Sequence, residues 1–379
     1  MGLGHIRRNT LLAQALHKPP VSANLLLVSG IRESGAFPLP RGVDSITLPA
    51  YHKLPDGTYC SRSLDLPLSR LIALRSQAIK ATLTAFSPDL LVVDNVPRGA
   101  LGELDETLAA LQAQGTHIVL GLRDIIDTPD VVARQWEKQG NREIVQKYFD
   151  AIWIYGDPRL YESARAYGLD TLKIPVTHVG YLDPSGRDTS HATLPSIGND
   201  PYALCMMGGG QDGQAVAEAF AQAELPRGWK GIILTGSMMP DAARERLLAL
   251  AAQRPELQVH EFVNEPLPLI RNARAIVAMG GYNSTMEVLA LDKRVMLVPR
   301  VKPRAEQWLR ASRLAELGLV HCLHPDALSP ATISHWLKAD APSRRRSHDI
   351  LDFGGLDRVS RQVLDTLASP SRSTEHAGQ

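Results

Sequence analysis

The chain has 379 residues, 44% of them hydrophobic, with 41 Lys and Arg against 40 Asp and Glu. This length allows two domains with separate cores. The formal net charge of +1 gives no reason to expect a nucleic-acid partner. The three cysteines, Cys60, Cys205 and Cys322, are too few and too widely spaced for a disulfide framework or a zinc pattern, and they suit a reducing cytosol. No apolar run reaches the roughly 18 residues of a membrane helix, and we expect no signal peptide. We therefore expect a cytoplasmic protein, for which peripheral contact with the inner face of a membrane stays open.

The N-terminal stretch MGLGHIRRN has the pattern of a glycine turn that enters a helix. Such a turn normally follows a buried strand, and in a doubly wound sheet the first strand is usually central. We therefore expect that a first strand of about 5–6 residues is missing ahead of this turn.

Strand and helix signals alternate through the first half. Short apolar runs predict strands, and apolar residues at helical spacing predict helices. The expected strands are 24–29, 45–48, 89–94, 117–121, 151–155 and 173–179, and the expected helices are 68–86, 101–114 and one or two within 131–149.

The stretch 184–200 is polar and contains Gly, Ser and Pro throughout, so it predicts a linker. Alternation restarts after it, with expected strands at 202–207, 231–234, 258–262 and 274–278. We expect an α/β protein with two doubly wound, Rossmann-like domains that face each other across a cleft. The expected parts are an acceptor-side domain over 1–183, the linker 184–200, a nucleotide-sugar domain over 201–345, a C-terminal helix over 346–368 and a disordered tail over 369–379.

Glycine-rich turns follow two strands of the second half, at 208–213 and at 280–284. Glycine lets the backbone turn sharply and approach a ligand closely. The helix after each turn directs free N–H groups and a partial positive charge at it, which favours phosphate. An ordinary strand–helix crossover with tightly packed glycines is the alternative.

Common nucleotide motifs are absent. In the N-terminal GLGHIR, Arg7 replaces the third glycine of the dinucleotide pattern, and the next strand ends in Ser29-Gly30 without an acid for ribose. No GK[ST] follows a glycine run, so a P-loop is unsupported. The chain also lacks a D-x-D pattern, and we expect no metal and no cofactor beyond a nucleotide-diphosphate sugar as co-substrate. Helix ends and basic side chains are then expected to meet the diphosphate charge.

Several motifs together resemble a known family. GLGH, GGGQDG, EFVNEPLPLI, MGGYNSTMEVLALDKRVMLVP and RAEQWLRA are similar to GT-B glycosyltransferases. The nearest named relative is the transferase that adds N-acetylglucosamine to the lipid-linked peptidoglycan precursor, of the family 28 C-terminal type. The chain resembles still more the bacterial group called predicted glycosyltransferases. The resemblance is strongest over 202–323.

The resemblance implies roles for particular residues. The donor diphosphate is expected at both glycine loops, at Gly209, Gly210, Gln211 and Asp212 of the first and at Gly280, Gly281, Tyr282, Asn283 and Ser284 of the second. The edge of the base is expected at Phe262 and Val263, and the ribose at Glu287. The donor sugar is expected at Glu306 and Gln307. Glu306 replaces the first of two adjacent glutamines in the relative, so the preferred sugar can differ.

The acceptor side matches the family less well. Loops at two strand ends offer Asn95, Arg98 and Arg123 as candidates that could meet an anionic acceptor, with a surface role as the alternative. Asp94 and Asp124 are further acid candidates, for which solvation at a loop edge is the alternative. We expect an unknown acceptor hydroxyl, with lipid-linked or polysaccharide acceptors in view.

His5 is the candidate catalytic base, because histidine can take a proton near neutral pH. Direct displacement of the diphosphate by the acceptor would invert the anomeric carbon. A histidine at a helix start can instead bind phosphate or cap the turn. The rivals to a UDP-GlcNAc-like transferase are a nucleotide-sugar epimerase or hydrolase of the same architecture, and a non-catalytic nucleotide-sugar-binding partner subunit.

Overall fold

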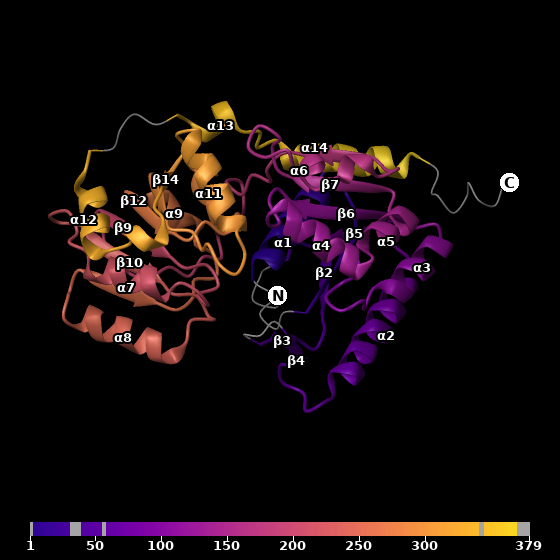
Figure 1. Cartoon of the computed structure of the whole chain (residues 1–379), viewed down its shortest axis with the longest axis horizontal. Helices are drawn as coiled ribbons and strands as arrows, with labels where there is room; N and C mark the ends of the chain where they lie inside the picture. Colours follow the sequence, from indigo (N-terminus) through magenta and orange to yellow (C-terminus); the bar gives the residue numbers. More distant parts are fainter. Residues whose placement is uncertain (1–2, 31–38, 55–57, 341–344, 370–379) are drawn as a thin grey trace. The chain divides into compact units, whose positions relative to one another are not determined.

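The computed structural model describes residues 3–30, 39–54, 58–340 and 345–369. The chain divides into two compact units (Figure 1). Unit 1 combines Met1–Leu182 with Gly354–Gln379, and unit 2 is Asp183–Phe353. The chain thus returns to unit 1 for its last helix.

Unit 2 is built on one sheet of six parallel strands, in the order β11-β10-β9-β12-β13-β14. The chain starts in the middle at β9, winds outward through β10 and β11, and then crosses to the other side of β9 for β12, β13 and β14. The strands are β9 (Tyr202–Met206), β10 (Lys230–Leu234), β11 (Leu257–His260), β12 (Ala275–Ala278), β13 (Val295–Leu297) and β14 (His321–Cys322).

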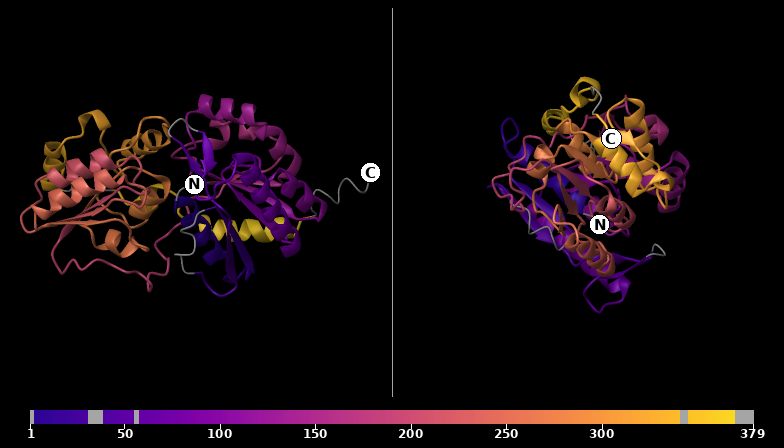
Figure 2. Two further views of the ribbon diagram at one scale, coloured as in Figure 1. Left: turned by 90° about the horizontal axis from the view of Figure 1, so that it is seen from below. Right: turned by 90° about the vertical axis from the view of Figure 1, so that its left-hand side faces the viewer.

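Helices cover both faces of this sheet (Figure 2). Parallel strands need such crossovers, and burial on both faces explains why β9 and β12 are apolar throughout. The helices of unit 2 are α7 (Gln214–Gln222), α8 (Asp241–Ala252), α9 (Leu267–Asn272), α10 (Tyr282–Ala290), α11 (Glu306–Glu316), α12 (Pro330–Lys338) and α13 (Ser347–Ile350).

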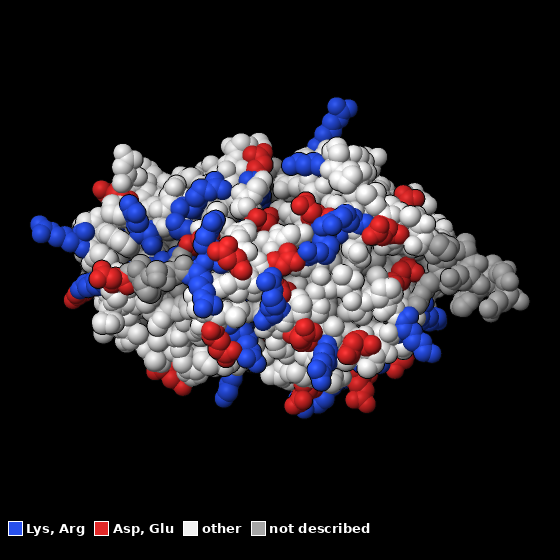
Figure 3. Space-filling view, turned by 90° about the horizontal axis from the view of Figure 1, so that it is seen from above, with Lys and Arg blue, Asp and Glu red and all other residues white. Residues whose placement is uncertain are grey.

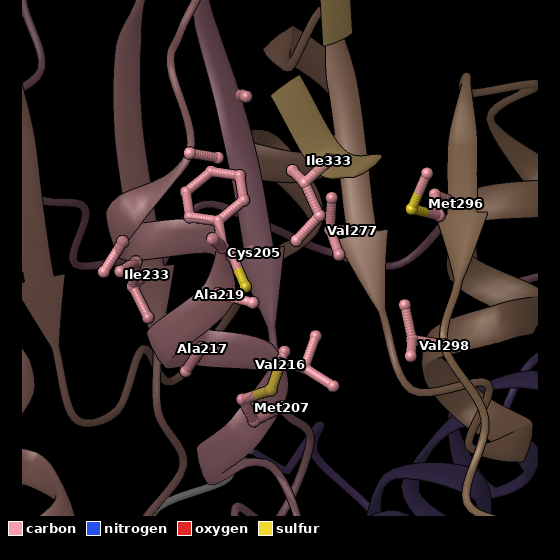
Figure 4. Close-up of a cluster of buried hydrophobic side chains, with 14 of the residues drawn as sticks. Cys205, Met207, Val216, Ala217, Ala219, Ile233, Val277, Met296, Val298 and Ile333 are labelled. Carbon is pink, nitrogen blue, oxygen red and sulfur yellow. The ribbon is translucent and has the colours of Figure 1, made fainter. Parts of the chain in front are cut away.

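The core of unit 2 lies where the sheet meets α7 and α12. Figure 4 shows side chains of β9, β10 and β12 gathered with those of these two helices. Cys205 of β9, Val277 of β12 and Ile333 of α12 are fully buried there. Burial of such side chains stabilises each by about 1.5–3 kcal/mol relative to exposure, which fixes the strands whose ends carry the glycine loops.

Unit 1 holds two parallel sheets and one short hairpin. The strands are β1 (Leu25–Ser29), β2 (Val43–Thr47), β3 (Tyr51–Lys53), β4 (Tyr59–Ser61), β5 (Leu90–Asp94), β6 (His117–Arg123), β7 (Ala151–Tyr155) and β8 (Val176–His178). The helices are α1 (Leu3–Leu16), α2 (Leu68–Phe86), α3 (Asp105–Ala113), α4 (Pro129–Gln139), α5 (Asn141–Tyr148), α6 (Ser163–Ala166) and α14 (Gly355–Leu367).

The expected single sheet of the first half is instead split. β1 pairs with β2, and β5 to β8 form a separate sheet. Within the described residues no strand pairs with both β1 and β5. Every residue of the apolar β1 is only half buried, whereas β6 is buried along nearly its whole length. An unpaired edge of β1 is consistent with this lower burial.

Three further expectations differ from the structure. The stretch 32–67 is rich in Gly and Pro and predicts irregular structure apart from the strand 45–48, yet it contains the antiparallel β3–β4 hairpin. Residues 31–38 and 55–57 lie outside the described part. The helix expected over 346–368 is two helices, α13 and α14, separated at 351–354. The stretch 184–200 belongs to unit 2, to which side-chain hydrogen bonds attach it. Residues 370–379, most of the expected tail, lie outside the described part.

Acidic and basic side chains are interspersed on the face drawn in Figure 3, as the near balance of charged residues suggests. Within the described residues, no helix combines the length and the apolar character needed to cross a membrane.

A buried ion pair ties the hairpin, α2 and the start of α3 together in unit 1. The Arg75 guanidinium donates from Nε to Glu103 Oε2 at 2.6 Å and from Nη2 to Oε1 at 2.9 Å, and from Nη1 to the Pro49 carbonyl at 2.5 Å. The Tyr51 hydroxyl donates to Glu103 at 2.9 Å, and the Tyr51 ring stacks on the guanidinium at 4.3 Å. Burial lowers the pKa of Arg75, but the bonds to Glu103 raise it more.

We predict that Glu103→Ala lowers the free energy of unfolding of unit 1 by about 3–5 kcal/mol, because it leaves a buried, unpaired guanidinium. Lys80→Ala is the matched control, since Lys80 and Glu106 join the same two helices as an exposed pair. That change should cost about 0–1 kcal/mol. Chemical denaturation of the three proteins measures both values, and equal losses would contradict the assignment.

Candidate functional site

The candidate nucleotide site of unit 2 lies at the point where the winding of the sheet reverses. β9 and β12 are neighbours, yet the chain leaves them toward opposite sides of the sheet. Ligands of doubly wound sheets bind outside the carboxyl ends of the strands at this point. The two predicted glycine loops follow β9 and β12, so the structure brings them to one edge.

The first loop, 208–213, needs its glycines partly for packing. Gly210 has a φ of +92°, and a Cβ there would lie 2.2 Å from the Thr235 carbonyl. A Cβ on Gly236, which follows β10, would likewise lie 2.4 Å from the Gly208 carbonyl oxygen and 2.5 Å from the Gly209 carbonyl carbon. The role of Gly210 is therefore explained by contact between two loops. The expected donor-binding residues Gln211 and Asp212 are exposed at the tip of the loop.

The second loop turns from β12 into α10. Gly280 has a φ of +77°, which favours glycine, and nothing lies within 4 Å of a Cβ built on Gly281. Gly281 is the N-cap of α10, and no side chain of the described residues caps this helix end. Asn283 and Ser284, which the resemblance places at the diphosphate, lie within the first turn of α10. The open space over Gly281 and the helix start suit an anion.

Tyr282 lies under the loop instead of at its surface. Its side chain is buried, and the guanidinium of the fully buried Arg310 stacks on its ring at 5.4 Å. Arg310 also donates to the Gly280 carbonyl at 3.4 Å. Tyr282 thus supports the loop from within, and its expected contact with the donor stays a prediction.

Glu287 is buried and ionically paired. Arg187 Nη2 donates to Glu287 Oε1 at 2.7 Å, and the same guanidinium binds Glu265. The structure therefore places an arginine of the expected linker against the carboxylate that the resemblance assigns to ribose.

Arg300 connects the first glycine loop with the start of α11. Its Nη1 donates to Asp212 at 2.6 Å, its Nη2 donates to Glu306 at 2.7 Å, and its backbone N–H donates to Gln307 at 3.0 Å. The structure thus brings together three residues that the sequence assigns to the diphosphate and the donor sugar. Phe262 is exposed after β11, whereas Val263 is buried.

In unit 1, His5 belongs to a second polar cluster, which is centred on the carboxylate of Asp94. His5 Nδ1 lies 2.7 Å from Asp94 Oδ2, Arg8 Nη2 donates to Asp94 Oδ1 at 2.5 Å, and Asn9 Nδ2 donates to Oδ2 at 3.3 Å. The three side chains project from one face of α1 because residues three and four apart are neighbours on a helix. Asp94 ends β5, so this cluster also lies at the carboxyl edge of a parallel sheet.

The protonation states of this pair follow from its surroundings. Burial, which alone would raise the pKa of Asp94, is outweighed by Arg8 and His5, and the pKa is well below its usual range. Burial lowers the pKa of His5, and Arg8 and Arg123 lower it further, against the opposite effect of Asp94. The lowered pKa favours the neutral ring of His5 at neutral pH. Arg8 Nη2 also lies 3.2 Å from Nδ1, and in the tautomer whose Nδ1–H donates to the ionised Asp94, Nε2 is the proton acceptor.

The three acceptor-side candidates, Asn95, Arg98 and Arg123, do not all lie at the same site. Arg123 Nε lies 3.5 Å from Asn95 Oδ1, next in the chain to Asp94, so these two join the His5 cluster. Arg98 is used elsewhere: it pairs with Asp105 and donates to the Gln139 carbonyl at 2.6 Å. The hydrogen bond to Asp105 also raises the pKa of Arg98.

Asp124 is fully buried, where it accepts from the Tyr181 hydroxyl at 3.0 Å and from the Ile125 N–H at 2.6 Å. It is a structural residue and neither an acceptor-site acid nor a solvated loop edge.

Arg8, Arg187 and Arg300 were not predicted as site residues, and no hydrogen-bond partner was predicted for Asp94. The helical spacing of His5, Arg8 and Asn9 could have indicated one functional face. No local signal connects Arg187 or Arg300 with its acidic partners. Within the described residues, no group of three or more His, Cys, Asp and Glu side chains is arranged to hold a metal ion.

No protein-family model matches the sequence, and no curated protein sequence matches it significantly. Solved structures do match in fold. The calicheamicin glycosyltransferase CalG4 is 18% identical with a TM-score of 0.62, over 97% of this chain and 96% of that chain. The UDP-GlcNAc 2-epimerase from Methanocaldococcus jannaschii is 11% identical with a TM-score of 0.59, over 95% and 96%.

A third similar structure, the UDP-GlcNAc 2-epimerase from Neisseria meningitidis bound to UDP-GlcNAc, is 13% identical with a TM-score of 0.58, over 91% of this chain and 99% of that chain. The chain therefore has the GT-B fold of two Rossmann-like domains, which glycosyltransferases and UDP-GlcNAc 2-epimerases share. The expected fold class is confirmed. The finer likeness to the peptidoglycan transferase stays a prediction.

We predict that the pKa of His5, measured by NMR titration of its ring, lies below the usual 6.5. Asp94→Asn should lower it further, because it removes the charge that stabilises the protonated ring. Arg123→Ala should raise it, because it removes a repelling cation. Shifts of the same sign in the two variants would contradict this arrangement of charges.

Proposed function

We propose that this protein is an inverting glycosyltransferase that moves a sugar from a UDP-sugar, of the UDP-GlcNAc type, to an acceptor hydroxyl. The observation that carries the proposal is the His5–Asp94 pair at the carboxyl edge of unit 1. A neutral imidazole held by an ionised carboxylate is a base for a hydroxyl proton. Support for the donor comes from the glycine loops of unit 2, the motif resemblance and a neighbour in fold that is bound to UDP-GlcNAc.

In the proposed step, His5 Nε2 takes the proton of the acceptor hydroxyl. The acceptor oxygen forms a bond to the anomeric carbon, the bond from that carbon to the diphosphate oxygen breaks, and the electron pair leaves with UDP. Asp94 holds the ring in orientation and stabilises the imidazolium that forms. The free N–H groups at the start of α10 stabilise the departing diphosphate. The step uses no metal, and attack from the opposite face inverts the anomeric carbon.

A nucleotide-sugar epimerase is the second candidate, because epimerases share the fold. Epimerisation requires a base for a carbon-bound proton of the sugar. Asp94 suits this poorly, since three donors bind it and its pKa is lowered. A carboxylate stabilised in its ionised form is a weak proton acceptor. An epimerase mechanism would therefore have to use His5 as its base, and the release of UDP without an acceptor is what tests it.

Donor release separates the candidates. A thermal-shift screen of nucleotide-sugars identifies the donor, since a ligand that binds the native state raises its stability. UDP release is then measured with and without hydroxyl acceptors, among which we include lipid-linked and polysaccharide acceptors. Release that needs an acceptor supports transfer. Release without one supports hydrolysis, an epimerised sugar supports epimerisation, and tight binding without turnover supports a partner subunit.

We predict that His5→Ala lowers kcat by on the order of 10²–10⁴-fold, the usual contribution of a general base, while UDP affinity stays unchanged. His17→Ala is the control, because His17 directly follows the other end of α1. Steady-state kinetics measures kcat, and calorimetric titration measures the affinity for UDP. Wild-type turnover in His5→Ala would show that His5 is structural.

We predict that Glu287→Ala weakens UDP binding about 10–100-fold, because a hydrogen bond to a charged group contributes about 1.5–3 kcal/mol. Titration calorimetry with UDP measures the change. Glu316→Ala is the control, since that glutamate ends α11 in an exposed pair with Arg313. An unchanged UDP affinity in Glu287→Ala would remove the ribose assignment.

A further inference from the structure

Arg187 is a buried arginine in the stretch that the sequence identifies as a linker. Its side chain is 9% exposed and lies between two carboxylates of unit 2. Nε is 2.6 Å from Glu265 Oε2, and Nη2 donates at 2.7 Å to both Glu265 Oε1 and Glu287 Oε1. The Glu287 side chain is 3% exposed, so this pair lies beneath the surface.

The pair joins two helices to the stretch 184–200. Glu265 also accepts from the Leu267 N–H at 2.9 Å, at the start of α9, and Glu287 projects from α10. The same stretch is attached by Arg271, which donates to the Ser185 carbonyl at 3.2 Å, and by Asn264, which donates to the His191 carbonyl at 2.8 Å. Arg187 is therefore held in place by its own segment.

The charges explain why an arginine is needed. Burial lowers the pKa of Arg187, but Glu287 and Glu265 raise this pKa more. The Arg187 side chain therefore stays a cation. Without it, two buried carboxylates would share one site without a counter-ion. Repulsion between the two carboxylates would then drive these side chains apart and release Glu287 from its position.

We propose that Arg187 is a positioning residue for the nucleotide ribose: it supplies the counter-charge of the Glu287 carboxylate and fixes its plane toward the ribose hydroxyls. This inference rests on the proposed nucleotide-sugar function. It gives the connecting stretch 184–200 a part in donor binding, in addition to its part in linking the chain.

The test compares UDP with 2′,3′-dideoxy-UDP, which lacks the hydroxyls in question. Wild-type protein should bind UDP at least tenfold more tightly than the dideoxy nucleotide. Arg187→Met should lose at least tenfold in UDP affinity and much less in dideoxy-UDP affinity, so that the preference shrinks. Arg187→Lys should retain part of the preference, because one ammonium supplies the charge but not the two-sided bonding. Arg313→Ala, which breaks an exposed pair with Glu316 on α11, should leave the preference unchanged.

Titration calorimetry gives the affinities, and thermal unfolding shows that each variant is folded. If Arg187→Met does not fold, Arg187→Lys carries the comparison. An undiminished preference in the folded variant overturns the positioning role while the proposed function stands. Tighter UDP binding in the variant also overturns it, since the arginine would then obstruct the ribose. A wild-type protein that binds both nucleotides equally removes the ribose assignment of Glu287 and this inference with it.

Discussion

The parallel pairing of β9 with β12 is the constraint on which the candidate donor site depends. Because the chain winds outward from these two strands in opposite directions, the loops that follow them diverge and leave backbone groups open at one edge. β13 pairs with the other edge of β12, which adds the loop that carries Arg300. Three neighbouring strands thus deliver the two glycine loops and the start of α11 to one region, where Arg300 connects the first and the third. No single side chain creates this convergence, which follows from strand order.

The secondary structure was largely predictable because each element is a local pattern. The helix 68–86 has the bounds that its apolar spacing indicates, and the four strands expected in the second half agree with the structure within a few residues. The β3–β4 hairpin was missed because strands of three residues carry little alternation in a stretch rich in glycine and proline. The split sheet of unit 1 could not be predicted from local patterns either, because such patterns do not show which strands pair with each other.

The site was predictable to the level of its loops and less so to the level of its side chains. Glycine turns at strand ends marked the right edges, yet the partners of the charged residues lie far away in the chain. Arg8 and Asp94 are 86 residues apart, Arg300 and Asp212 are 88 apart, and Arg187 and Glu287 are 100 apart. Only the fold decides such pairs. Arg98 shows the same limit in reverse, because an acid seven residues away binds it and removes it from the acceptor side.

The buried arginines have a common physical role in both units. A carboxylate removed from water needs a cation or several donors to stay ionised, and a planar guanidinium can meet two acceptors at once. Arg8 does this for Asp94, and Arg187 does it for Glu265 and Glu287. In unit 1 the result is an acid that is too well stabilised to accept a proton itself, beside a neutral histidine that can. The cluster therefore offers the imidazole of His5, and not the carboxylate of Asp94, as its proton acceptor.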